Sequence, residues 1–198
     1  MNLLKMMVFL LLTFLLAACG TSVKRMEIDE VKDMSGRWND TDSQMVSEAM
    51  VQDCLNHPWL TEFSQRQGKK PDVIVGAIRN RSSEHIATET FTKDLERALI
   101  NSGRANFVAS AEERLGVRDE RLDQDLNAAP ETRKAPGMEA GADYMLIGAI
   151  NSIVDKEGGD KVVFYQVDLE LIDMTNNRKV WIGNKKIKKF VDRRRFGF

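Results

Sequence analysis

The chain has 198 residues, of which 42% are hydrophobic and 30% are charged, and its formal net charge is −1. This near-neutral balance gives no indication of a nucleic-acid partner. The two histidines and Cys54, which we expect to be the one unmodified cysteine, are too few for a closed zinc site. The length is sufficient for one domain with one sizeable core.

The first eighteen residues have the layout of a secretory signal. Lys5 precedes an apolar run from Met6 to Leu16, which is shorter than the roughly 20 residues that span a membrane. Leu16-Ala17-Ala18-Cys19 resembles the bacterial lipobox, which implies cleavage after Ala18 and a lipid on the sulfur of Cys19. The alternative is an ordinary signal peptide followed by a chance cysteine. Lipidation leaves Cys54 as the single free thiol, so we expect no intrachain disulfide.

Residues 19–36 are mostly polar and lack the periodicity of a helix or a strand, so we interpret them as a flexible tether. We expect residues 37–198 to form a single domain with a basic C-terminal tail. Val46, Met50 and Cys54 share one face of a predicted first helix, and this spacing makes Cys54 a small buried hydrophobic residue. His57-Pro58 ends that helix, and a short second one follows around Trp59 to Phe63.

Two further helices have local start and stop signals. Phe91, Leu95 and Leu99 recur at helical spacing, and Gly103 is suited to end that helix. Ser110 and Glu113 have the spacing of a capping box. They begin a predicted helix that contains Leu115, Leu122 and Leu126. Residues 135–140 are expected to form one or two more helical turns, ended by Gly141.

Strands are predicted at residues 72–78, followed by a polar loop at 79–83, and at residues 144–150, 163–172 and 179–187. The unbroken apolar run from Tyr144 to Ile150 indicates a central strand covered on both faces, with a buried helix as the alternative. Asn176-Asn177 favours a turn between the last two strands. The fold class is therefore α/β or α+β, with a mixed, mostly antiparallel sheet of about four to five strands and helices packed on its faces.

No motif for catalysis is present. The chain lacks a nucleophile elbow, a phosphate-binding loop and a histidine array, so we expect no enzyme activity, cofactor, metal site or small-molecule substrate. Residues 178–195 contain nine lysines and arginines against Asp192 alone. They form either an edge strand and tail kept soluble by lysine or a surface for an anionic partner.

Several short motifs together resemble those of the LpoB-type penicillin-binding protein activators. They are the lipobox, Trp38-Asn39-Asp40, Asn80-Arg81-Ser82, Gly141-Ala142-Asp143-Tyr144 and Val180-Trp181. The resemblance implies an α/β domain related to the N-terminal domain of TolB and to CsgG, anchored in the outer membrane and facing the periplasm. It also implies that the chain stimulates a class A peptidoglycan synthase by direct contact. Well-known members carry a long proline-rich tether, whereas residues 19–36 contain no proline.

Docking of this kind requires exposed polar groups on a rigid scaffold. We therefore take Asn80, Arg81, Ser82 and Trp38 as candidate partner-binding residues. Arg81 offers a planar fork of donors for an acidic partner. Asn80 and Ser82 have the alternative role of satisfying turn hydrogen bonds. The second functional hypothesis is a CsgG-like structural or secretion-associated outer-membrane lipoprotein.

Overall fold

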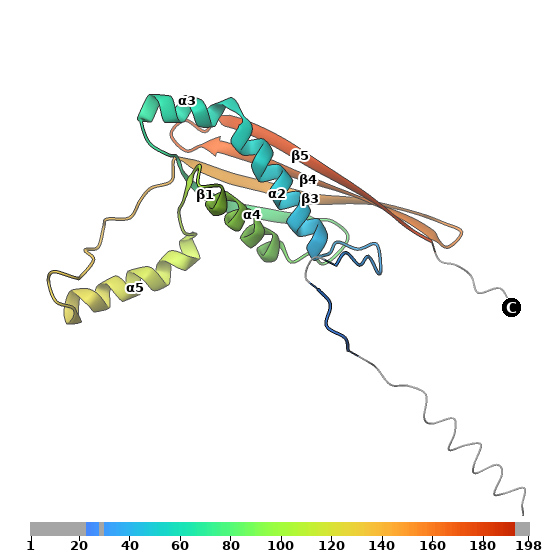
Figure 1. Cartoon of the computed structure of the whole chain (residues 1–198), viewed down its shortest axis with the longest axis horizontal. Coiled ribbons are helices and arrows are strands. Elements are labelled where there is room, and N and C mark those ends of the chain that lie inside the picture. The colour runs from blue at the N-terminus through green and yellow to red at the C-terminus, as the bar shows by residue number, and fades with distance from the viewer. Residues whose placement is uncertain (1–22, 28–29, 193–198) are drawn as a thin grey trace, which may run out of the picture. The chain divides into compact units, whose positions relative to one another are not determined.

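The computed structural model describes residues 23–27 and 30–192, and it separates the chain into Met1–Lys32 and Asp33–Phe198. Residues 23–27 and 30–32 contain no helix or strand. The expected signal peptide, Ala18 and Cys19 lie outside the described residues. The second unit contains all of the helices and strands described below, and Figure 1 shows their arrangement.

The elements of the second unit follow one another with short connections, apart from the segment before β3. They are α2 (Asp40–Asn56), α3 (Pro58–Gln67), β1 (Asp72–Arg81), α4 (Thr88–Ser102), β2 (Asn106–Phe107), α5 (Ala111–Asn127), β3 (Tyr144–Glu157), β4 (Asp160–Asp173) and β5 (Lys179–Val191).

Local sequence determines most helix ends. Asn39 and Asp42 form a capping box at the start of α2, in which each side chain accepts a hydrogen bond from the other residue's backbone N–H. Ser110 and Glu113 do the same for α5, as predicted. Gly103 ends α4 in the left-handed region with φ of 62°, also as predicted. The helix expected at residues 135–140 is wrong, because this segment holds only turns and Gly137, not Gly141, has positive φ.

The five strands form one mixed sheet in the order β2-β1-β3-β4-β5. β1 runs parallel to β2 and β3, while β3, β4 and β5 are antiparallel. Gly158 and Gly159, both with positive φ, form the two-residue turn between β3 and β4, because such a turn matches the twist of the strands. The predicted α/β class and the mostly antiparallel sheet, with β3 at its centre, are confirmed.

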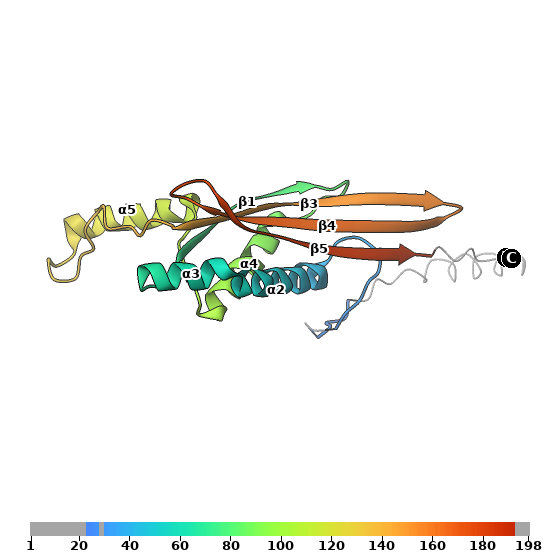
Figure 2. The same cartoon turned by 90° about the horizontal axis from the view of Figure 1, so that it is seen from above.

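Helices α2, α3 and α4 all lie on one face of the sheet (Figure 2). The alternate residues of β4, from Val163 to Leu171, are buried against these helices. The sequence predicted cover on both faces of β3, but no described helix packs on the opposite face, which we call the open face. Met145, Ile147 and Ala149 lie there half-buried, because side chains of neighbouring strands shield them in part.

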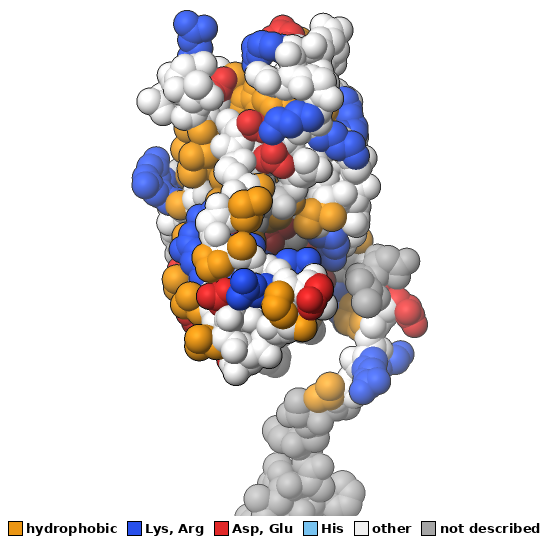
Figure 3. Space-filling view, turned by 90° about the vertical axis from the view of Figure 1, so that its left-hand side faces the viewer, with side chains coloured by type: hydrophobic (Ala, Val, Ile, Leu, Met, Phe, Trp, Pro, Cys, Tyr) orange, Lys and Arg blue, Asp and Glu red, His pale blue; other side chains and the backbone are white. Residues whose placement is uncertain are grey.

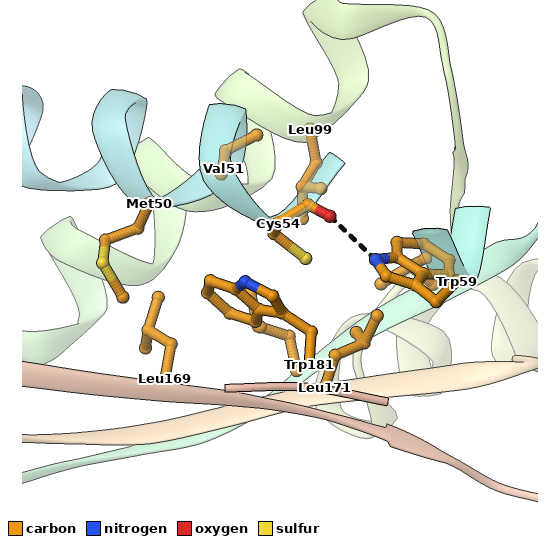
Figure 4. Close-up of a pocket in the computed structure, with 10 residues that line it drawn as sticks. Met50, Val51, Cys54, Trp59, Leu99, Leu169, Leu171 and Trp181 are labelled. Carbon is orange, nitrogen blue, oxygen red and sulfur yellow. Dashed lines mark hydrogen bonds between the residues drawn. The ribbon is translucent and has the colours of Figure 1, made fainter. Parts of the chain in front are cut away.

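Cys54 belongs to the core, as its spacing predicted. It lies between Trp59 and Trp181 (Figure 4), and the indole Nε1 of Trp59 donates to the Cys54 carbonyl oxygen at 2.8 Å. Burial raises the pKa of the Cys54 thiol to about 12. The cavity among these side chains measures only about 10 Å³ and is lined by apolar groups, so this is a packed core and not a ligand site.

Candidate functional site: the open face and the Glu84 cluster

Arg81 lies at the end of β1 on the open face of the sheet. The sequence placed residues 79–83 in a loop, but β1 continues to Arg81 because Arg79 and Arg81 remain paired with Ala149 and Asn151 of β3. Both arginine side chains are exposed, and neither forms an ion pair with any residue in 23–27 or 30–192. Their guanidinium groups are therefore available to an acidic partner.

A groove of about 390 Å³ borders these two arginines. Its apolar floor comes from alternate residues of the sheet, and its polar margin comes from β1, β3 and β4. The lining residues are Ala77, Arg79, Arg81, Ile147, Gly148, Ala149, Asn151, Asp168, Glu170 and Ile182. Apolar groups with a few charged groups at the margin are typical of a contact surface for another protein.

Asn80 and Ser82 form the turn that follows β1. The amide of Asn80 donates to the Glu84 carbonyl oxygen at 2.7 Å, and the Ser82 backbone N–H donates to the Asn80 side-chain oxygen at 2.9 Å. The Ser82 hydroxyl lies 2.7 Å from that same oxygen. Of the two roles predicted for this pair, the structure shows the turn hydrogen bonds. These residues hold the turn in place, and Arg81 between them points to the open face.

Trp38 is half-buried and packs on the core. Its ring makes edge contacts with Phe91 and Tyr165, with centroids 6.1 and 5.6 Å apart, and its backbone N–H donates to the carboxylate of Glu84 at 3.3 Å. Trp38 and the Asn80–Ser82 turn are thus brought together, because both bond to Glu84. Arg81 is the one candidate among the four whose side chain belongs to the open face instead.

Glu84 is a residue that the sequence interpretation missed. Its carboxylate accepts a hydrogen bond from the buried Tyr165 hydroxyl at 2.7 Å, and Lys161 lies 3.8 Å away. Burial, followed by the carboxylate of Glu84, raises the pKa of Tyr165. No local pattern could have indicated this bond, because 81 positions separate the two residues. These bonds hold the backbone of Trp38, the turn after β1 and Tyr165 of β4 together.

Lys189 also joins segments that are far apart in the sequence. Its ammonium lies 2.6 Å from carboxylate oxygens of both Asp33 and Asp42, and it donates to the Arg37 carbonyl oxygen at 3.2 Å. The Lys189 side chain is only 9% exposed. One of the lysines assigned to the basic C-terminal segment is therefore a structural ion-pair partner and not part of an exposed patch. Asp33, which we placed in the tether, contacts the folded unit through this pair.

The described residues meet neither the requirements of a metal site nor those of a membrane-spanning helix. In residues 23–27 and 30–192, no group of three histidine, cysteine or carboxylate side chains is arranged to hold a metal ion. No helix in these ranges is both long and apolar enough to cross a membrane. The exposed arginines and the groove of the open face are suited to binding a macromolecule.

Comparisons with known proteins give a family and a set of similar folds. A family model described as "Peptidoglycan-synthase activator LpoB" matches residues 42–187. The solved C-terminal domain of LpoB from Salmonella enterica is 16% identical, covering 75% of this chain and 99% of that one with a TM-score of 0.43. The corresponding domain from Escherichia coli is also 16% identical, with coverage of 75% and 99% and a TM-score of 0.41.

The solution structure of Escherichia coli LpoB is 15% identical, covering 87% of this chain and 83% of that one with a TM-score of 0.42. A comparison with curated protein sequences gives no match. The family model spans well over half of the chain, from the first turn of α2 into β5. The chain therefore belongs to the LpoB family of peptidoglycan-synthase activators.

Proposed function

We propose that the chain is an outer-membrane lipoprotein that binds and stimulates a bifunctional class A penicillin-binding protein. Membership of the LpoB family carries this proposal. The lipid anchor would be Cys19, exposed by cleavage after Ala18, as the lipobox implies. The protein then acts by contact and not by catalysis.

Charge and exposure support Arg81 as a contact residue. Its guanidinium is exposed at the rim of the open-face groove, and the hydrogen-bonded turn at Asn80 and Ser82 fixes the strand end that carries it. Because the backbone at Arg81 is already fixed, less conformational entropy is lost when its side chain binds a partner. Trp38 contributes to binding only indirectly. Its backbone N–H bonds to Glu84, its ring packs on Tyr165, and Glu84 in turn bonds to the turn that carries Arg81.

The reach of the anchor limits where the partner can be met. Fourteen residue steps separate Cys19 from Asp33, where the folded unit begins. At about 3.5 Å per residue the fully extended segment spans at most about 50 Å. The domain therefore stays close to its membrane, and the synthase must extend toward it.

The test is a binding and activity measurement with purified proteins. The full chain in detergent is titrated against each class A penicillin-binding protein of the organism, and glycan polymerisation is followed with and without the chain. We expect tight binding and faster polymerisation, and we expect Arg81→Ala to weaken binding while its Tm stays that of wild type. Arg178→Ala is the matched control, since Arg178 is an exposed arginine in the β4–β5 turn, beside the start of β3, whereas Arg81 pairs with Asn151 in the middle of that strand.

Two results would count against the proposal. If none of the synthases binds and the chain forms large rings, the CsgG-like structural role is favoured. If the synthase binds but Arg81→Ala binds as tightly as wild type, the contact surface lies elsewhere.

A further inference from the structure

Helix α5 presents an uncovered leucine face. Leu115 and Leu122 are each 58% exposed and Leu126 is 83% exposed, and α5 has no buried residue. Figure 1 shows α5 apart from the layer formed by α2 and α4, and Figure 3 shows that side of the molecule, with apolar side chains at the surface among charged ones. An exposed helix of 17 residues is marginal alone in water, so an apolar stripe on one face indicates a surface that a partner covers.

The orientation of this stripe is fixed by contacts on another face of the helix. Arg118 donates two hydrogen bonds to the carboxylate of Glu139 at 2.8 and 2.9 Å, and Arg121 donates a third at 3.2 Å. At the start of α5, Lys93 of α4 pairs with Glu113. The segment that returns to β3 therefore binds the arginine face of α5, which leaves the leucines uncovered.

Charge beside the stripe distinguishes among possible partners. The helix carries six acidic residues against three arginines. The three arginines face Glu139. Four carboxylates lie beside the leucine stripe or beyond it. None of these four carboxylates forms an ion pair in the described part of the chain. These four are Glu112, Asp119, Glu120 and Asp123. The uncovered surface is thus apolar with an acidic margin.

This margin disfavours two occupants. A second copy that packed α5 against α5 in antiparallel fashion would bring the carboxylate margins of the two helices together, and like charges at such short range repel. An anionic lipid surface would be repelled for the same reason, since helices that lie on membranes carry lysine and arginine beside their apolar face. The complementary occupant is a protein groove with an apolar floor and a lysine- or arginine-rich rim.

We propose that the leucine face of α5 docks into such a basic-rimmed groove on the class A synthase, as a second contact besides Arg81. This inference rests on the proposed function for the identity of the partner. The leucines supply apolar area that is buried only in the complex, and the carboxylates guide the approach and fix the orientation.

The experiment compares Leu122→Gln/Leu126→Gln with wild type in binding to the same purified synthase. Glutamine keeps helix propensity close to that of leucine, and neither leucine is buried, so the fold and Tm should be unchanged. We expect the Kd to rise about tenfold or more, as for the truncation of central interface residues. Ile100→Gln on α4 is the matched control, since Ile100 is 54% exposed on a helix far from the stripe in sequence, and its Kd should stay that of wild type.

A second variant tests the charge argument. Asp119→Asn/Asp123→Asn should slow association and reduce its dependence on salt, because the acidic margin then attracts the basic rim less strongly. If the leucine variant binds as tightly as wild type while wild type does bind, this inference fails and the proposed function stands. If wild type binds no synthase, both fail. Sedimentation showing self-association that the leucine variant abolishes would identify a second copy as the occupant and overturn the inference.

Discussion

Replacing Gly148 by valine tests whether β3 is packed as closely against β4 as the structure indicates. A Cβ atom built on Gly148 would lie 2.3 Å from the backbone carbonyl oxygen of Asp168 and 2.4 Å from Cδ2 of Leu169. The leucine side chain can rotate, but the carbonyl oxygen belongs to β4, which is paired along the whole length of β3. The two strands must therefore separate locally to accommodate the new side chain.

Overpacking of this kind costs about 1 to 3 kcal/mol, and we expect the upper end because a backbone atom blocks the site. At about 2 to 4 °C per kcal/mol for a domain of this size, Tm should fall by about 6 to 12 °C. Thermal unfolding followed by circular dichroism measures the change. Gly141→Val is the control, because a Cβ there meets nothing within 4 Å and Gly141 does not have positive φ.

A Tm for Gly148→Val within about 2 °C of wild type would refute the close packing of β3 on β4, since even a cost of 1 kcal/mol reaches that shift. A similar fall for Gly141→Val would show that the loss comes from valine at any glycine and not from the contact.

Four further predictions follow from particular side chains. Tyr165→Phe should destabilise the fold by about 1.5 to 3 kcal/mol in urea unfolding, because the Glu84 carboxylate loses its buried donor; an unchanged free energy of unfolding would contradict this. The Lys93 ammonium, followed by the Ser110 cap, lowers the pKa of Glu113 to about 2 from 4.5. Its stabilising effect is therefore complete above about pH 4.5 and is lost as pH falls through about 2, so a carboxyl NMR titration with a midpoint near 4.5 would refute the pairing. Cys54 should react with thiol reagents at neutral pH only after unfolding, given its buried thiol with a pKa of about 12. Cys19→Ser should abolish partition of the protein into detergent and membranes, and retained partition would exclude the lipid anchor.

Local sequence by itself determined most elements of this fold and the family, although it also predicted a helix at residues 135–140 where the structure has only turns. The Ser110–Glu113 capping box and the Gly103 stop depend on residues within one helical turn of each other, so their spacing is visible in the chain. The alternation in β4 and the position of Cys54 on the inner face of α2 are likewise periodic patterns. The sequence suggested Arg81 as a candidate contact residue because it follows an apolar run, but it did not show that the strand extends to Arg81 itself.

Tertiary structure alone decided which surfaces are covered. A leucine stripe on α5 has the same spacing as a core-facing stripe, and only the absence of a neighbouring element over it, among the described residues, makes it an exposed surface. The apolar run of β3 likewise does not show that, within residues 30–192, helices pack on only one of its faces. The hydrogen bond between Glu84 and Tyr165 and the ion pair between Lys189 and Asp42 join residues that are 81 and 147 positions apart, respectively. Their geometry depends on how strands and helices pack, which no local pattern encodes, because burial is a property of neighbours that the chain brings together only on folding.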